Sequence, residues 1–304
     1  MQPTVFHATH HKSGSQWVAA VLQHCAPERF RRPRLDLSFF YEKPIEPGNV
    51  YLTVYVPRRD LEAVTCTGTG PFPGRRGFLF RHPMVIARNW ARFRTRRFPV
   101  RRFAVIRDLR DTLVSLYYSV KVSHVFHLAW QFKTRELLNA LPEEDGLASW
   151  IGEGPRTRFD GRLKPPFLKE QYAPIENAEP PAVVAFMEGI LDYIADIQLS
   201  WMDGDDLVVR YEELLDDEFG GFERIVDHCH IEIDREKLHE IIRNNSFETM
   251  TGGRRRGEED VAAHQRKGIV GDWRNHFTDR LKARFKDRFG DVLIRTGYET
   301  DMDW

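Results

Sequence analysis

The chain has 304 residues, of which 41% are hydrophobic, and this is enough apolar content to exclude a wholly disordered protein. The 45 Lys and Arg residues balance the 45 Asp and Glu residues, which excludes a general electrostatic attraction to nucleic acid or membrane. Three widely spaced cysteines, with no CxxC pair, favour a reduced intracellular setting.

The N-terminus reads MQPTVFHATHHKSGS and lacks the apolar core of a signal peptide. No stretch approaches the roughly 20 apolar residues that a membrane-spanning helix needs. We therefore expect a cytoplasmic protein without a membrane span.

Short runs of β-branched and aromatic residues alternate with helical patterns, which favours parallel βαβ units. Strands are expected at 4–9, 50–56, 78–81, 102–107 and 207–211. Helices are expected at 15–25, 84–94, 111–123, 181–201, 218–228, 235–244 and 279–289. The sequence thus predicts an α/β fold with a mainly parallel sheet of about five strands.

Residues 123–180 show no clear period and mix aromatic residues with Pro and Gly. A long irregular stretch in a compact domain is typically a lid, a binding loop or an insert. Because no repeat or low-complexity linker divides the chain, we expect one domain, residues 1–304, with a lid or insert at about 123–180.

The first expected strand runs into residues 10–17, HHKSGSQW, and then into a helix. Such a turn can bind an anion, because the first N–H groups of the helix are unpaired and the helix dipole favours negative charge. Lys12 adds a positive charge, and Ser13, Ser15 and Gln16 add side-chain donors. The Walker pattern GxxxxGK[ST] is absent, which argues against an ordinary ATPase. From this motif alone, an ordinary loop with a solvated lysine is an equal alternative.

Two later segments also carry groups suited to a phosphate. In FAVIRDLRDTLVSLYYS, residues 103–119, Arg107 ends a strand, Ser115 lies in the next helix, and Asp111 is a candidate cap of that helix. In RKGIVGDWRNHFT, residues 266–278, two adjacent cations precede Gly268, where backbone can approach an anion closely. A solvated basic strand end is the alternative for the first segment.

The three motifs together resemble the PAPS-dependent sulfotransferase family, whose donor is 3′-phosphoadenosine 5′-phosphosulfate (PAPS). KSGSQW resembles its 5′-phosphosulfate loop, usually PKSGTTW, and RDLRDTLVSLYYS resembles its 3′-phosphate segment, often RDPRDVAVSYYH. RKGIVGDWRNHFT resembles its C-terminal signature RKGxxGDWKNxF, which is the most specific of the three. The motifs occur in the family's order, and the resemblance reaches from residue 4 to about 298. It implies a three-layer, P-loop NTPase-like fold with helices flanking the sheet.

The resemblance also implies roles for individual residues. Those expected to hold the 5′-phosphosulfate are Lys12, Ser13, Gly14, Ser15 and Gln16. Those expected to hold the 3′-phosphate are Arg107, Ser115, Arg266, Lys267 and Gly268. Those expected around the adenine are Trp17, Tyr211 and Phe247, and Ser246 is expected to be a further cofactor-binding residue. PAPS is then the co-substrate, PAP (3′-phosphoadenosine 5′-phosphate) is the product, and no metal is required.

The candidate base comes from RHP at 81–83, which resembles the family's THLP-type segment and makes His82 the catalytic base, with Lys12 stabilising the leaving group. Three positions depart from the family pattern. His11 replaces the usual Pro, Leu109 replaces a common Pro, and Phe80 stands where many relatives carry a second lysine. The family's dimerisation segment KxxxTVxxxE is not recognisable, so the oligomeric state stays open.

Parts of the sequence also fit other functions. Residues 88–110 contain nine arginines with interleaved aromatic residues, a pattern that could bind nucleic acid, although part of this run is expected in a buried strand. A P-loop kinase using ATP and an inactive family member are further alternatives. The histidines near residues 7–11 and 228–230 lack a complete ligand set, so no metal site is expected.

The acceptor is expected to carry a hydroxyl group or, less commonly, an amine. In the family it is selected by variable loops, here 30–48, 66–77, 123–180 and 248–262. Their aromatic content fits an apolar or aromatic small molecule or a lipid, and a sugar hydroxyl is an alternative because aromatic rings also pack on sugars.

Overall fold

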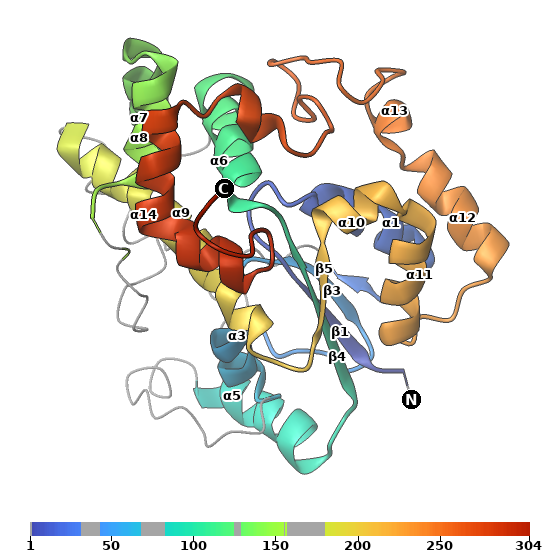
Figure 1. The fold of residues 1–304 in the computed structure, drawn as a ribbon. Coiled ribbons are helices and arrows are strands. Elements are labelled where there is room, and N and C mark those ends of the chain that lie inside the picture. Colours follow the sequence, from blue (N-terminus) through green and yellow to red (C-terminus); the bar gives the residue numbers. More distant parts are fainter. Residues whose placement is uncertain (1, 32–42, 68–82, 125–128, 155, 157–179) are drawn as a thin grey trace. The chain divides into compact units, whose positions relative to one another are not determined.

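The computed structural model describes residues 2–31, 43–67, 83–124, 129–154, 156 and 180–304 (Figure 1). The chain forms two compact units, each built from two segments. The first unit consists of Met1–Ile106 and Ser200–Ser246, and the second of Arg107–Leu199 and Phe247–Trp304.

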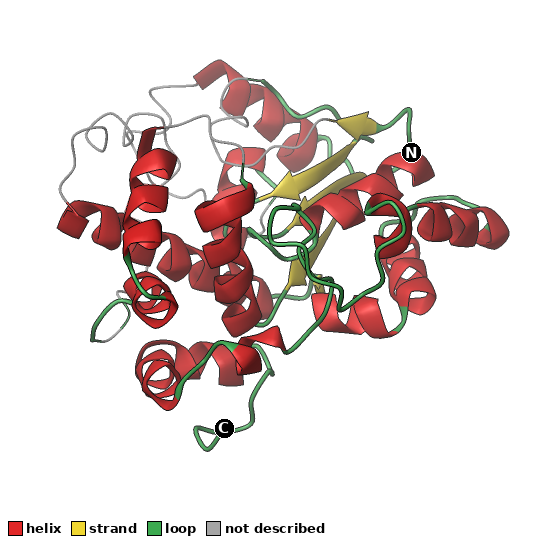
Figure 2. Ribbon diagram, turned by 90° about the horizontal axis from the view of Figure 1, so that it is seen from above, coloured by secondary structure: helices red, strands yellow, loops and turns green. Residues whose placement is uncertain are grey.

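The first unit holds a five-stranded parallel sheet in the order β2-β3-β1-β4-β5. Figure 2 shows strands in yellow with helices in red around them. Its strands are β1 (Thr4–Ala8), β2 (Phe30–Arg31), β3 (Val50–Val54), β4 (Val100–Ile106) and β5 (Leu207–Arg210). Every residue of β1 and β3 is buried, which is why these strands appear in the sequence as continuous rather than alternating apolar runs. The expected α/β fold with a parallel sheet is confirmed.

Four of the expected strands are present, with ends within two residues of the prediction. The expected strand at 78–81 lies outside the described residues, as does His82. The edge strand β2 was not predicted, because two residues carry no detectable period.

Helices connect the strands of the first unit. Helix α1 (Ser15–Cys25) follows β1, and α10 (Tyr211–Asp216), α11 (Glu218–His228) and α12 (Arg235–Asn244) follow β5. Between β3 and β4 lie α3 (Arg58–Thr65), α5 (Pro83–Asn89) and the π-helical turn η1 (Trp90–Thr95). The chain moves from β1 to β3 and then back across β1 to β4, so right-handed connections place α1 on one face of the sheet and α3 and α5 on the other.

The second unit is helical. Its elements are α6 (Leu109–Tyr118), the π-helical turn η2 (Ser119–Ser123), α7 (Ala129–Ala140), α8 (Glu143–Ile151), most of α9 (Pro180–Met202), α13 (Phe247–Met250), the 3-10 turn η5 (Asp272–Asn275) and α14 (Asp279–Arg295). They enclose one apolar core, whose larger members include Leu113, Trp150, Leu191, Phe285 and Phe289.

The expectation that residues 123–180 are irregular is wrong for α7 and α8. In α8 every residue from Gly146 to Ile151 is buried, including Ser149. A helix end that is buried on all sides shows no amphipathic period, so the spacing of apolar residues in the sequence did not predict α8. The role of this region as a lid or insert stays a prediction.

Three general features bear on the expected setting. None of the helices in the described ranges is both long and apolar enough to cross a membrane. The same ranges contain no group of three His, Cys, Asp or Glu residues placed to hold a metal ion. The three cysteines are free and buried, and burial raises the pKa of Cys25 and of Cys229 to about 12.

Candidate functional site

The turn between β1 and α1 has a backbone that suits an anion. Lys12 and Gly14 both adopt left-handed conformations, with φ of 65° and 80°. A Cβ added to Gly14 would lie 2.5 Å from Cε2 of Tyr211, so this position requires glycine both for its backbone angle and for space. The Tyr211 ring therefore packs directly on the turn that precedes α1.

The serine hydroxyls of this turn have partners inside the first unit. The Ser13 hydroxyl is buried, donates to the carbonyl of His10 (2.8 Å), and lies 2.5 Å from the hydroxyl of Thr9. Thr9 in turn donates to the carbonyl of Val105 on β4 (3.1 Å). The Ser13 hydroxyl is therefore engaged in shaping the loop.

At the start of α1, Ser15 and the hydroxyl of Tyr55 lie 2.9 Å apart. Tyr55 follows β3, the neighbour of β1, and burial raises its pKa, partly offset by the hydrogen bond with Ser15. Tyr55 therefore stays protonated and holds the first residue of α1. Tyr55 was not predicted from the sequence, because a tyrosine after a strand belongs to none of the motifs.

The residues expected around adenine in the first unit come together. The ring of Trp17 meets Tyr211 edge-on at 6.3 Å between centroids and meets Phe222 at 5.1 Å. The Nε1 atom of Trp17 is buried and has no hydrogen-bond partner among the described residues. A buried donor of this kind suggests a polar ligand group, as the edge of a purine would supply. Ser246 lies at the end of the same unit, after α12.

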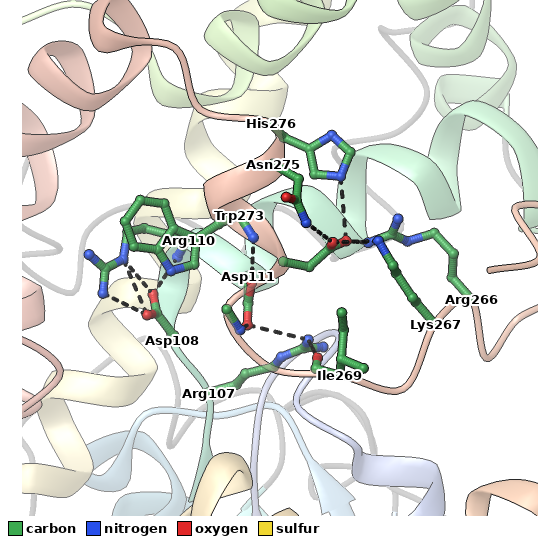
Figure 3. Close-up of polar contacts among 12 residues, drawn as sticks. Arg107, Asp108, Arg110, Asp111, Arg266, Lys267, Ile269, Trp273, Asn275 and His276 are labelled. Atoms are coloured by element: carbon green, nitrogen blue, oxygen red, sulfur yellow. Dashed lines mark hydrogen bonds and ion pairs between the residues drawn. The ribbon is translucent and has the colours of Figure 1, made fainter. Parts of the chain in front are cut away.

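The second unit carries the cations expected to bind the 3′-phosphate (Figure 3). Arg107 donates from Nη2 to the carbonyl of Ile269 (3.2 Å), although the two residues are 162 positions apart in the sequence. The amide of Gln198 donates to the carbonyl of Arg107 (2.7 Å). The end of the arginine-bearing strand and the C-terminal motif thus form one cluster.

Asp111 has a different role from the one expected. The cap of α6 is Asp108, which accepts from the N–H of Arg110 (2.9 Å). Asp111 lies in the first turn and accepts from the N–H groups of Gly271 (2.6 Å) and Trp273 (2.9 Å). Its pKa is raised by burial, which the Arg107 charge and these N–H groups partly offset. The prediction that Asp111 caps the helix was wrong, because a long-range loop competes for its carboxylate.

Asp272 organises the two cations of the C-terminal motif. Its carboxylate accepts from Arg266, from Lys267 (2.7 Å) and from the amide of Asn275 (2.9 Å), and it lies 3.4 Å from His276 (Figure 3). Burial alone would raise the pKa of Asp272, but these hydrogen bonds outweigh burial and lower the pKa well below its usual range. The sequence did offer one indication of this role, because Asp272 lies five residues after Lys267 in the adjacent pair Arg266 and Lys267.

His276 links this carboxylate to α8. Its Nδ1 lies 2.6 Å from Glu143. Burial opposes protonation, but the hydrogen bonds and charges of Asp272 and Glu143 prevail and raise the pKa of His276. The imidazolium form is thus favoured between two carboxylates.

Gly268 also has a requirement for glycine. Its φ is 64°, and an added Cβ would lie 2.5 Å from Cε2 of Phe247. The aromatic ring expected at the adenine therefore lies on the backbone expected at the 3′-phosphate. Ser115, by contrast, is half-buried on α6, and no contact found among the described residues joins it to the cluster.

Some arginines of the run at 88–110 are engaged within the protein, whereas others, such as Arg88, Arg96 and Arg97, are exposed. Arg92 donates to the carbonyl of Ile45, and Arg102 pairs with Glu62 (3.0 Å) and Asp206 (3.0 Å). Arginines held by the chain's own carboxylates are poorly placed to bind nucleic acid.

Comparison with known proteins agrees with this geometry. A family model described as "Sulfotransferase domain" matches residues 100–297. Human "Sulfotransferase 2A1" is 34% identical over 95 residues, which are 29% of this chain and 33% of that protein. Rat "Sulfotransferase 1E1" is 29% identical over 122 residues, which are 35% of this chain and 41% of that protein. The matched regions thus span less than half the length of either relative.

Among solved structures, a mouse sulfotransferase, SULT7A1, complexed with PAP, is similar with a TM-score of 0.50 and 16% sequence identity. The similarity covers 99% of this chain and 86% of that one, and at this identity it supports the fold. The family match covers more than half of the chain and contains both the Arg107 segment and the C-terminal motif. On this ground, the chain belongs to the sulfotransferase domain family.

Proposed function

We propose that this protein transfers a sulfuryl group from PAPS to an acceptor hydroxyl or, less commonly, an amine. In this proposal residues 1–304 act as one domain, in the cytoplasm, without a metal. The observation that carries the proposal is the cluster in which Arg107 contacts the loop bearing Arg266 and Lys267. Three cations around one turn suit a doubly charged phosphate monoester. PAPS, the donor used by the family, carries such a phosphate at its 3′ position.

The residues of the second unit would bind the 3′-phosphate. Arg266 and Lys267 are half-buried, with side chains 11% and 19% exposed, so their charges are shielded less by water than surface charges are. The N–H of Gly268 would add a short backbone donor, because the residue has no Cβ in the way. Ser115 and Phe247 complete the proposed group.

The residues of the first unit would bind the 5′-phosphosulfate and the base. The N–H groups at the start of α1 and the side chains of Lys12 and Gln16 would contact the anion. The adenine would lie by Trp17 and Tyr211, where the unpartnered Nε1 of Trp17 fits a purine acceptor. The observations that support this part of the proposal are the turn at Gly14 and the contact between Trp17 and Tyr211.

The proposed chemistry is an in-line displacement at sulfur. A bond forms between the acceptor oxygen and sulfur while the bond from sulfur to the bridging oxygen breaks, and its electron pair stays on the 5′-phosphate of PAP. His82 would take the acceptor's proton, because histidine has an unperturbed pKa near neutrality. Lys12 would stabilise the negative charge that grows on the bridging oxygen.

A titration tests the donor. PAP, 5′-AMP and ATP are titrated into the protein by calorimetry, in the presence of EDTA. We expect PAP to bind at least tenfold more tightly than 5′-AMP, because each charge-assisted hydrogen bond to the 3′-phosphate contributes about 1.5–3 kcal/mol. Equal affinities for PAP and 5′-AMP, or binding of ATP that requires Mg²⁺, would contradict the proposal.

A further inference from the structure

Arg110 is an unusual arginine, since it is only 2% exposed. Its guanidinium lies 4.0 Å from the ring centroid of Trp273 and 4.4 Å from that of Trp304. The two indoles meet edge-on, with centroids 5.7 Å apart and an interplanar angle of 86°. A desolvated guanidinium against two indole faces is a favourable cation–π arrangement.

Two carboxylates satisfy the charge of Arg110. Asp108, in the preceding turn, pairs with it at 2.7 Å (Figure 3), and Glu299 accepts from its Nη1 at 2.5 Å. Burial alone would lower the pKa of Arg110, but these two carboxylates outweigh burial and raise it. Glu299 and Trp304 thus both reach Arg110 from the segment that follows α14.

The turn that directs this segment is well defined. Gly297 has a φ of 73°, its N–H donates to the carbonyl of Ile294 (3.0 Å), and the N–H of Tyr298 donates to the carbonyl of Leu293 (2.8 Å). This is a Schellman motif, which ends the helix and reverses the chain. Residues 299–304 are therefore led back toward α6 by backbone hydrogen bonds.

The proposed 3′-phosphate site shares parts with this arrangement. The indole of Trp273 packs on Arg110, and the backbone N–H of Trp273 donates to Asp111. The residue before it, Asp272, accepts hydrogen bonds from Arg266 and Lys267. A shift of the Trp273 ring would therefore move Asp272 and the two cations with it. Trp304 holds that ring from one side, and Glu299 holds the arginine beneath it.

We infer that Glu299 and Trp304 are positioning residues of the 3′-phosphate site and act on it through Arg110 and Trp273. The inference rests on the proposed function. Neither residue touches the phosphate. Their effect is to fix the loop that presents Arg266 and Lys267, so their loss should lower the preference for a 3′-phosphorylated nucleotide and leave affinity for the rest of the nucleotide unchanged.

The experiment compares PAP with 5′-AMP in four variants of the full chain. Trp304→Ala and Glu299→Gln remove the two contacts, Trp304→Phe keeps a ring on Arg110, and Met302→Ala is a matched control in the same segment. For each variant, the ratio of the PAP and 5′-AMP dissociation constants is measured by calorimetry, and thermal unfolding is recorded alongside. The ratio separates positioning from stability, because a general loss of folded protein affects both nucleotides equally.

We expect Trp304→Ala to weaken PAP binding about tenfold, because a desolvated cation–π contact is lost, while 5′-AMP binding changes little. Glu299→Gln should act in the same direction, Trp304→Phe should restore most of the preference, and Met302→Ala should match the wild type. An unchanged ratio in both Trp304→Ala and Glu299→Gln would overturn the inference. If the wild type itself showed no preference for PAP over 5′-AMP, the proposed function would fail instead, so the two failures are distinguishable.

Discussion

The substitution Asp272→Asn tests a buried carboxylate of the second unit that has several polar partners. The wild-type carboxylate is 3% exposed and accepts hydrogen bonds from Arg266, Lys267 and Asn275. Asparagine keeps the shape and one acceptor oxygen but removes the charge that pairs with two cations. The variant therefore isolates the electrostatic contribution of the residue from its packing.

The magnitude follows from burial and from the partners that stay in place. Breaking a buried ion pair on one side typically costs about 3–5 kcal/mol. Arg266 would still pair with Glu259, and Lys267 is 19% exposed and can be partly solvated. We therefore expect the free energy of unfolding to fall by about 3 kcal/mol at neutral pH, near the lower end of that range.

The pH dependence gives a second, independent signature. The folded-state pKa of Asp272 is lowered below its unfolded value of about 3.9, so its stabilisation is present above that pH and is lost as the pH falls through the folded-state pKa. Asparagine does not titrate. The stability difference between wild type and variant should be largest near pH 5 and should narrow below about pH 4. It should also narrow as the pH rises above about 6.5, because His276, whose pKa Asp272 helps to raise, then loses its proton.

The assay is urea unfolding followed by tryptophan fluorescence, since Trp273 adjoins the substituted residue. Asp279→Asn is the control, because that carboxylate is fully exposed and forms an i,i+3 pair with Lys282. It also lies in the first turn of α14, so we expect a loss of at most about 1 kcal/mol, well below that of Asp272→Asn. A stability loss that stayed the same from pH 7 to pH 3, or no loss at all, would refute the account of Asp272.

Four further variants test the proposed roles. Lys12→Ala should lower kcat far more than PAP affinity, because a charge at the bridging oxygen stabilises the transition state, and a variant that lost only affinity in steady-state kinetics would identify a mere anchor. Arg107→Ala should weaken PAP binding by about 1.5–3 kcal/mol with little effect on 5′-AMP binding. An unchanged PAP dissociation constant by calorimetry would show that Arg107 does not bind the 3′-phosphate. Gly268→Ala should weaken PAP binding at least tenfold, because the added Cβ would clash with Phe247. Gly252 has a similar φ of 71° but open space around it, so Gly252→Ala should not weaken PAP binding, and equal effects of the two substitutions would mean that backbone strain alone is responsible. His82→Asn should lower kcat about 10²–10⁴-fold, keep PAP affinity and lose the ionisation near neutral pH from the rate profile, and near-native kcat would mean that another group takes the proton.

Elements with a strong local pattern were predicted well from the sequence. Helices α1, α11 and α12 begin and end at the predicted residues. The β1–α1 turn was found because a buried strand, a glycine and a helix start follow one another within a few residues. In each case the decisive interactions lie close together in the sequence.

Features that depend on distant partners were not predicted. Asp111 looks like a helix cap until the loop at Gly271–Trp273 competes for it. Tyr55 meets Ser15 at the start of α1 only because β3 pairs with β1. A single sequence does not show which segments fold against one another, so these roles required the structure.

The candidate site divides in the same way. The motifs identified Gly14, Tyr211, Phe247 and Gly268 by resemblance, and the structure adds that each glycine lies under an aromatic ring. The C-terminal motif contains Asp272 but did not indicate its role, which is to accept hydrogen bonds from Arg266 and Lys267. Residues that position others in this way are harder to recognise from a sequence motif than the residues they position.

The central claim is sulfuryl transfer from PAPS, and the most direct measurement is the transfer itself. The protein is incubated with PAPS and pools of hydroxyl acceptors in the presence of EDTA, and products are identified by mass spectrometry. The account predicts that an acceptor gains SO₃ while an equal amount of PAP forms, and that Lys12→Ala abolishes most of both. Formation of PAP that proceeds equally in the wild type and Lys12→Ala, with no sulfated product in any pool, would contradict it.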